Sequence, residues 1–484
     1  PAALTLSAPD SLLEDPSLAA LVLDPRSGQL LALAGDLTPR APGTLLTPFV
    51  YLTGFTRGLG PASLVWDLPA ADQNPANFHG PMRLRAALAN DYLVPARDVL
   101  TQMGAQNAAN AARSFGLSLE PGAAFPFDSA PQSILDLSAA YGTFAALGLR
   151  NGQLINDSIQ PSIILRVESI DGAVWLDWSQ PESQSVVTPA LAYLMNHILS
   201  DGPARWPAWG NPNPLEIGRP VAVKPGATDS ADAWVIGYTP ARLVAVWIGS
   251  DAPESSPLQG GSRGVASLWS ALMQTAVVSL PPDNWIMPAG VSEIDVCDPS
   301  GLLPTDDCPS IVREVFLNGF EPSHSDTLFR SYMINRETGL LATVFTPPEL
   351  VERRVFMVLP EAARAWAASS GLPVPPDAYD AIPLGVVNPN VNIASPAMFA
   401  EVSGRVQISG SAMGEGFQYY RIQVGQGLNP RAWIVISGDV TAPVTNGPLA
   451  EWDATGLSGL YAIQLVVVYA DQRVETAVIQ VTVK

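Results

Sequence analysis

Three short apolar segments follow one another near the middle of the chain, and they restrict the fold more than any other feature. They are residues 219–224, 231–238 and 242–249, which are rich in Val, Trp and Ile and are separated by turns. Short segments of β-branched and aromatic residues between turns are typical of consecutive antiparallel strands. The chain is therefore expected to contain an antiparallel sheet.

Helical patterns surround these strands. We expect helices at residues 43–59, at 83–103 with a break near Asn90–Pro95, at 132–149, at 188–200 and at 265–279. Thr188 would be the N-cap of the fourth helix, with Pro189 at its first position. Two apolar runs flank the turn residues DPRSGQ within 19–34, which predicts a β-hairpin. Helices around an antiparallel sheet predict an α+β domain over residues 1–280.

The rest of the chain changes character twice. Residues 281–385 are rich in Pro and predict a loop-rich connecting module with a short helix near 360–369. Residues 386–484 alternate apolar and polar positions between turns, which predicts an immunoglobulin-like β-sandwich. A length of 484 residues agrees with about three domains.

Charge excludes two classes of partner. The chain has 45 acidic and 25 basic residues, a net charge of −20, which argues against nucleic acid and anionic membrane surfaces. The sequence contains no uninterrupted run of 18 apolar residues, so no transmembrane helix is expected. We interpret the start at Pro1 as that of a processed or truncated product, whose missing N-terminal segment would provide an anchor.

The two cysteines, Cys297 and Cys308, are close in sequence, in a loop full of Pro, Asp and Ser. They favour a disulfide and hence an oxidising, extracytoplasmic compartment, although two free buried thiols are the alternative. His79, His197 and His324 show no ligand spacing around them, so neither a metal nor another cofactor is expected.

Other polar and aromatic residues suggest sites only weakly. Asp24, Asp36 and Asp67 are better explained as turn residues than as paired carboxylates, and His79 as a loop residue. Five aromatic residues of the last domain could form a glycan-binding stripe, but at strand spacing most should lie in the core; they are Tyr419, Tyr420, Trp433, Trp452 and Tyr461.

The segment 221–249, VAVKPGATDSADAWVIGYTPARLVAVWIG, resembles the third-motif region of penicillin-binding transpeptidases. Segments at 41–69 and 74–104 are similar, in the same order, to the regions of the first two family motifs. VCDPSGLLPTDDCP and RVFMVLPEAARAW resemble the C-terminal extension of one branch of bifunctional class A proteins. The resemblance covers residues 1 to about 385 and implies the family's α+β transpeptidase fold. The glycosyltransferase domain that normally precedes it has no counterpart in these residues.

The resemblance also implies where the motifs S-x-x-K, S-x-N and K-T-G should be. They align with Thr44–Thr47, with Asn90–Tyr92 and with Lys224–Gly226. Threonine replaces both the nucleophilic serine and the lysine of the first motif, and only Lys224 and Gly226 survive of the third. A hydroxyl is a weak nucleophile without an adjacent base. Because Lys224 and Lys484 are the only lysines, no other lysine can replace the missing base.

Three residues near the third motif remain candidates for binding. Ala227 could offer the oxyanion N–H that the resemblance implies, and Thr228 follows it. Lys224 has two interpretations: an anion site for a peptide carboxylate, or a lysine paired with an acidic residue such as Asp229 or Asp232. Pro225 lacks the N–H that a substrate-pairing strand would use.

The sequence therefore favours a catalytically inactive cell-envelope protein of this type, with a binding, scaffolding or structural role. Its partners would be peptidoglycan or other envelope proteins, in particular for the C-terminal domain as an interaction module. Two alternatives remain open. One is an active peptidoglycan transpeptidase or carboxypeptidase that uses Thr44 and Lys224; the other is a purely structural subunit of a larger surface assembly.

Overall fold

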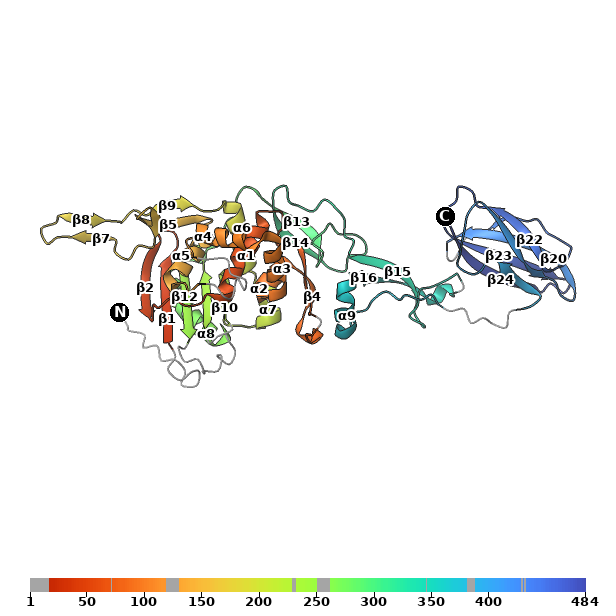
Figure 1. The fold of residues 1–484 in the computed structure, drawn as a ribbon, viewed down its shortest axis with the longest axis horizontal. Coiled ribbons are helices and arrows are strands. Elements are labelled where there is room, and N and C mark those ends of the chain that lie inside the picture. Colours follow the sequence, from red (N-terminus) through yellow and green to blue (C-terminus); the bar gives the residue numbers. More distant parts are fainter. Residues whose placement is uncertain are drawn as a thin grey trace. The chain divides into compact units, whose positions relative to one another are not determined.

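A computed structural model describes residues 17–70, 72–118, 130–228, 232–249, 262–344, 346–380, 388–427, 430 and 432–484 (Figure 1). The chain divides into two compact units. The first comprises Pro1–Leu328 and Pro360–Leu372, and the second Phe329–Leu359 and Pro373–Lys484. The predicted division into three domains, with boundaries at 280 and 385, stays a prediction.

A five-stranded antiparallel sheet organises the first unit. Its strand order is β10 (Ala222–Ala227), β11 (Ala233–Tyr238), β12 (Leu243–Gly249), β1 (Ser17–Asp24) and β2 (Gln29–Gly35). The predicted hairpin and the three predicted strands are confirmed. The first of those strands is shifted, however, because β10 continues through Pro225 to Ala227.

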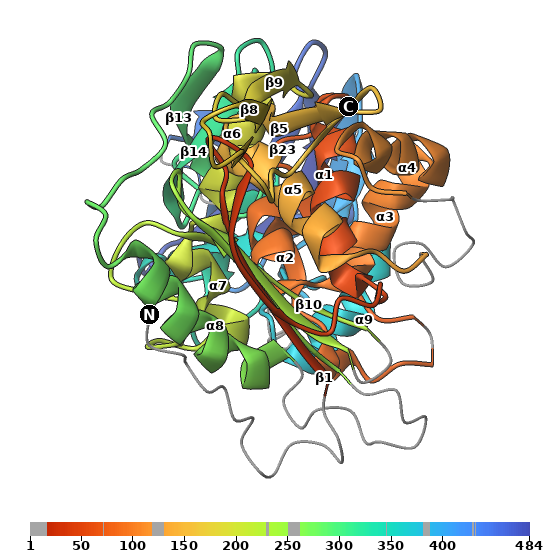
Figure 2. The same ribbon diagram turned by 90° about the vertical axis from the view of Figure 1, so that its left-hand side faces the viewer.

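Helices cover both faces of this sheet, as Figure 2 shows for α5 and α8. Alternate strand residues such as Trp234 and Ile236 share one core with α1 (Thr47–Phe55), α5 (Ile134–Ala145) and α6 (Pro189–Leu199). Their neighbours, such as Val235, pack with α8 (Ser262–Val277) in a second core. Burial on both faces explains why the strands β11 and β12 are apolar at nearly every position.

The remaining elements of the first unit surround these layers. They are α2 (Leu84–Asn90), α3 (Leu93–Met103), α4 (Ala105–Ser114), α7 (Gly202–Trp209), the pair β3 (Leu64–Asp67) and β4 (Gly80–Arg83), the sheet of β5 (Leu149–Ile155), β6 (Ser158–Gln160) and β9 (Glu182–Ser185), and the hairpin β7 (Arg166–Glu168) and β8 (Val174–Asp177). The predicted break in the helix at 83–103 occurs at Asp91 and Tyr92, between α2 and α3. No described helix is both long and apolar enough to cross a membrane.

The region 281–385 contains more strand than expected. It has two hairpins, β13 (Val291–Cys297) with β14 (Ile311–Leu317) in the first unit and β15 (Phe329–Asn335) with β16 (Val351–Met357) in the second. The predicted short helix is α9 (Glu361–Ser370). The predicted disulfide is present, with Cα atoms of Cys297 and Cys308 5.8 Å apart, and it joins the ends of the β13–β14 connection.

Two C-terminal sheets share one core. The first sheet is β17 (Val391–Ser395), β19 (Arg405–Ala412) and β22 (Val444–Asp453); the second is β18 (Ala400–Val402), β24 (Val474–Val483), β23 (Gly459–Tyr469), β20 (Phe417–Gln426) and β21 (Ile434–Val435). Three of the five aromatic candidates, Tyr420, Trp452 and Tyr461, are buried in this core. They therefore pack between strands and do not form an exposed stripe.

A buried ion network attaches β14 to the helical layer. The carboxylate of Glu314 accepts hydrogen bonds from Arg83 and from both Nε and Nη2 of Arg85, and Arg85 also contacts Asp201. Burial alone would raise the pKa of Glu314, but the hydrogen bond from Arg85 and the two guanidinium charges lower it below its ordinary value. The network compensates charges that would otherwise be costly to bury.

Replacing Glu314 with Gln should destabilise the first unit by about 3–5 kcal/mol at neutral pH, because two partly or fully buried guanidiniums lose their shared carboxylate. The stabilisation by a carboxylate of lowered pKa is complete above its unfolded-state pKa and is lost as pH falls through the folded-state pKa. The difference in unfolding free energy between E314Q and wild type should therefore become smaller at acidic pH. Calorimetric unfolding at several pH values measures it. Glu293→Gln, which loses only an exposed pair with Arg313, should cost about 0–1 kcal/mol; equal effects would contradict the role of the network.

Replacing Cys308 with Ser should also destabilise the first unit. The disulfide closes a short loop between residues 11 apart, for which the chain-entropy model gives about 3 kcal/mol. Chemical denaturation of the C308S variant and of reduced wild type should give similar losses. Thiol titration of unfolded, unreduced protein should find no free thiol, and two titratable thiols would contradict the bond.

Candidate functional site

The three predicted motif segments meet beside strand β10. The first lies in the 3₁₀ turn η1 (Gly43–Leu46) and the start of α1, the second between α2 and α3, and the third in β10. Lys224 Nζ donates to Asp91 Oδ1 at 2.7 Å, and the Ala227 N–H donates to Thr44 Oγ1 at 3.2 Å. We call Thr44, Thr47, Asp91, Lys224 and Ala227 the motif site.

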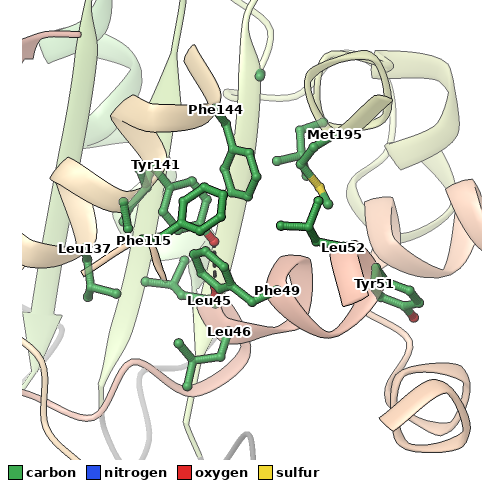
Figure 3. Close-up of a cluster of buried hydrophobic side chains, with 14 of the residues drawn as sticks. Leu45, Leu46, Phe49, Tyr51, Leu52, Phe115, Leu137, Tyr141, Phe144 and Met195 are labelled. Carbon is green, nitrogen blue, oxygen red and sulfur yellow. Dashed lines mark hydrogen bonds between the residues drawn. The ribbon is translucent and has the colours of Figure 1, made fainter. Parts of the chain in front are cut away.

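Aromatic packing holds η1 in place. Phe49 of α1 packs among Phe115, Tyr141 and Phe144 (Figure 3), with ring centroids 5.2 to 6.1 Å apart. The hydroxyl of Tyr141 donates to the Leu45 carbonyl at 2.6 Å. This anchor fixes the backbone that carries Thr44 and Thr47.

Gly226 allows η1 to lie directly against β10. A Cβ at this position would be 2.6 Å from Cγ of Leu45, which is closer than real side chains approach. Thr44 and Thr47 are consequently buried, with 5% and 1% of their surface exposed. Thr47 Oγ1 donates to the Thr44 carbonyl at 2.8 Å and is 3.5 Å from Asp91 Oδ1.

Asp91 is the functional residue that sequence reasoning missed. It caps α2 in the left-handed conformation, with φ of 61°, which Asp tolerates better than most residues. Lys224 alternates with Val223 along β10, so its side chain lies on the face of the sheet toward α1 and α6. Burial lowers the pKa of Lys224, and the nearby Asp91 carboxylate opposes that shift.

The predicted acidic partners of Lys224 need correction. Asp232 accepts from Trp247 Nε1 at 2.8 Å instead, and Asp229 is outside the described residues. The ion pair is made by Asp91, which is far from Lys224 in the sequence. One sequence signal could have identified it, because Asp91 is the only acidic residue within the three aligned motifs, Thr44–Thr47, Asn90–Tyr92 and Lys224–Gly226.

The outer edge of β10 is already hydrogen-bonded. Ala227 N–H points out of the sheet toward Thr44, and residues two apart on a strand present their backbone to the same side. An N–H of residue 225 would therefore point to this outer side, but proline has none. The Pro225 carbonyl accepts a hydrogen bond from Lys224 Nζ at 2.8 Å. Proline fits here because β10 is an edge strand.

The other motif residues do not join this cluster. Asn90 links α2 to α7, since its amide donates to the Ala204 carbonyl at 2.7 Å and accepts from Ala208 N–H. The ring of Tyr92 stacks on His79 at 3.9 Å. Thr228 follows β10, where its N–H donates to the Asp232 carbonyl at 3.3 Å.

The other weak candidates are separate from one another. Asp67 accepts from the backbone and the Nδ1 atom of His79, at 3.1 and 2.7 Å. His79 lies in a loop before β4, as predicted, and the buried Asp67 carboxylate fixes its position. Asp24 binds Arg26 and Arg242, whereas Asp36 binds Thr38 and Arg40. Within the described ranges, no cluster of His, Cys, Asp or Glu could hold a metal.

Replacing Asp91 with Asn should destabilise the first unit by about 3 kcal/mol, because a buried ammonium loses its carboxylate. Asn keeps the left-handed backbone conformation, so the loss reports the charge. Lys224→Met should cost less, and adding it to D91N should recover part of the loss. Calorimetry of the two single variants and the double variant gives the coupling; strictly additive losses would contradict the pair.

The pH dependence provides an independent measurement. Because the folded-state pKa of Lys224 is lowered, the unfolded chain binds more protons in the window just below the ordinary lysine pKa. The contribution of Lys224 to the free energy of unfolding should therefore rise with pH through that window. The K224M variant should lack this part of the rise.

Comparison with known proteins identifies the fold around this site. The family model "Penicillin-binding protein 1A, C-terminal domain" matches residues 287–331. Penicillin-binding protein 1A of Clostridium botulinum strain Langeland is 29% identical over 306 residues, which cover 59% of this chain and 35% of the relative. Penicillin-binding protein 1C of Escherichia coli K12 is 30% identical over 308 residues, or 58% and 36% of the two chains.

The chain spans about a third of the length of these relatives. The crystal structure of penicillin-binding protein 1A from Haemophilus influenzae superposes with a TM-score of 0.55 at 20% identity, covering 64% of this chain and 54% of that one. That likeness establishes the mixed α+β fold. The chain is thus similar to penicillin-binding proteins 1A and 1C over a little under two thirds of its length, and residues 287–331 match the model of the penicillin-binding protein 1A C-terminal domain.

Proposed function

We propose that this chain is a catalytically inactive, penicillin-binding-protein-like pseudo-transpeptidase of the cell envelope. One observation carries the proposal: the Thr44 hydroxyl contacts the Ala227 N–H, while the ammonium of Lys224 is engaged by Asp91. Thr44 thus occupies the donor that an oxyanion would need, and the ammonium of Lys224 is paired with the Asp91 carboxylate, which opposes the loss of its proton. Without a base, a hydroxyl loses about 10²–10⁴ in rate.

The closed edge of β10 supports the same proposal. A peptide substrate that paired with this strand would need backbone groups of residues 225 and 227. Pro225 has no N–H, its carbonyl accepts from Lys224, and the Ala227 N–H is bonded to Thr44. Pairing would require breaking contacts that the buried motif site uses for its own stability.

The role that remains is binding, scaffolding or structure in the envelope. Similarity to penicillin-binding proteins and the disulfide support an extracytoplasmic location, where peptidoglycan or other envelope proteins would be the partners. We divide the chain functionally into a transpeptidase-like domain at 1–280, a connecting module at 281–385 and an immunoglobulin-like sandwich at 386–484. The sandwich would act as an interaction module.

Incubation with excess penicillin should leave the mass of the intact protein unchanged. The physical reason is the absence of an activated nucleophile at Thr44 and the burial of its hydroxyl. Intact-protein mass spectrometry measures the outcome, with a catalytically competent penicillin-binding transpeptidase treated in parallel as the positive control. A stoichiometric acyl adduct that maps to Thr44 would overturn the proposal and favour an active enzyme using Thr44 and Lys224.

A further inference from the structure

A cavity of about 380 Å³ lies in the first unit, away from the motif site. Its lining comes from Gly116 after α4, the start of α5, strands β5 and β6, and residues that flank the β7–β8 hairpin. Its volume lies within the range of small-molecule sites. Arg150 of β5 supplies a guanidinium to its wall, and Asp136 of α5 supplies a carboxylate.

The backbone around Gly116 fixes the position of the Arg150 guanidinium. A Cβ at Gly116 would be 1.7 Å from Nη1 of Arg150, so only glycine leaves room for this guanidinium. Nη1 donates to the Phe115 carbonyl at 2.8 Å, which sets the orientation of the group. The Nε atom is buried and has no hydrogen-bond partner.

Arg150 is also a charge without a close counter-ion. Within the part of the chain that the structure describes, it forms no ion pair, although acidic residues outnumber basic ones by 45 to 25. Burial lowers the pKa of Arg150, and Asp136 opposes this only through its charge at longer range. A partly desolvated guanidinium of this kind favours an anion at its open side.

The wall beyond Arg150 is apolar and accessible. Ile163 and Ile164, which follow β6, are 65% and 52% exposed, and Trp178 completes this side of the cavity. The two exposed isoleucines, beside the half-buried Trp178, indicate a surface at the cavity that a ligand can bury. Asp136 on the same wall disfavours a multiply charged anion.

We propose that this cavity binds a monocarboxylate with an apolar body, its carboxylate on Arg150 and its body against Ile163, Ile164 and Trp178. The site is independent of the motif site and goes beyond the proposed inactive role. A single carboxylate on an apolar body occurs both in free organic acids and at the C-terminus of short apolar peptides. The test therefore includes one compound of each kind.

Two probes distinguish the sources: 4-phenylbutyrate, and N-acetyl-alanyl-leucine with a free carboxyl end. Isothermal titration of the full chain near pH 7 should detect at least one of them with a dissociation constant below about 1 mM. The tighter of the two identifies the source. Their uncharged amides should bind at least about tenfold more weakly, because a charged hydrogen bond is lost.

Variants localise the binding. Arg150→Gln should weaken it by about ten- to a hundredfold, whereas Arg113→Gln, which makes the same charge change on α4 outside the cavity lining, should not. Ile164→Asp places a negative charge on the exposed wall and should weaken binding without disturbing the Arg150 contacts, so the test survives if R150Q fails to fold. If neither probe binds, or the amides bind equally, or R150Q and I164D bind as wild type, the proposal is wrong.

Discussion

Burial of the central sheet on both faces is the constraint on which the rest of the first unit depends. Strands β11 and β12 present apolar side chains alternately to α5 and to α8, so neither helix can be removed without exposing a full face to water. The layer of α1, α5 and α6 in turn places η1 against the edge strand β10. Everything at the motif site follows from that close approach, which Gly226 permits.

The contacts of the motif site stabilise the packing of η1 against β10. A buried lysine is costly unless a carboxylate compensates it, and Asp91 supplies that carboxylate from the end of α2. The two threonines fill the space between η1 and β10, and their hydroxyls bond to backbone atoms. The same contacts that stabilise the site also occupy backbone groups at the edge of the sheet.

The cavity beside Arg150 contrasts with this closed site. At Lys224 the charge is fully buried and paired, whereas at Arg150 it is partly buried, seated by Gly116 and open on one side. The Arg150 cavity is also lined by the exposed apolar side chains of Ile163 and Ile164. The proposed pocket for a monocarboxylate at Arg150 is therefore separate from the motif site.

Local signals determined much of this protein. The hairpin of β1 and β2, the strands β11 and β12, the Thr188 cap of α6 and the Cys297–Cys308 bond were predictable because each depends on residues close in the chain. The hairpins β13–β14 and β15–β16 were not predicted. Frequent prolines conceal the strand pattern there, and long connections separate the paired strands. Only the tertiary structure decided that Asp91 pairs with Lys224, that Glu314 binds Arg83 and Arg85, and that Gly116 seats Arg150. These contacts join residues remote in sequence, and Coulomb and packing energies depend on distances in space that no local pattern records.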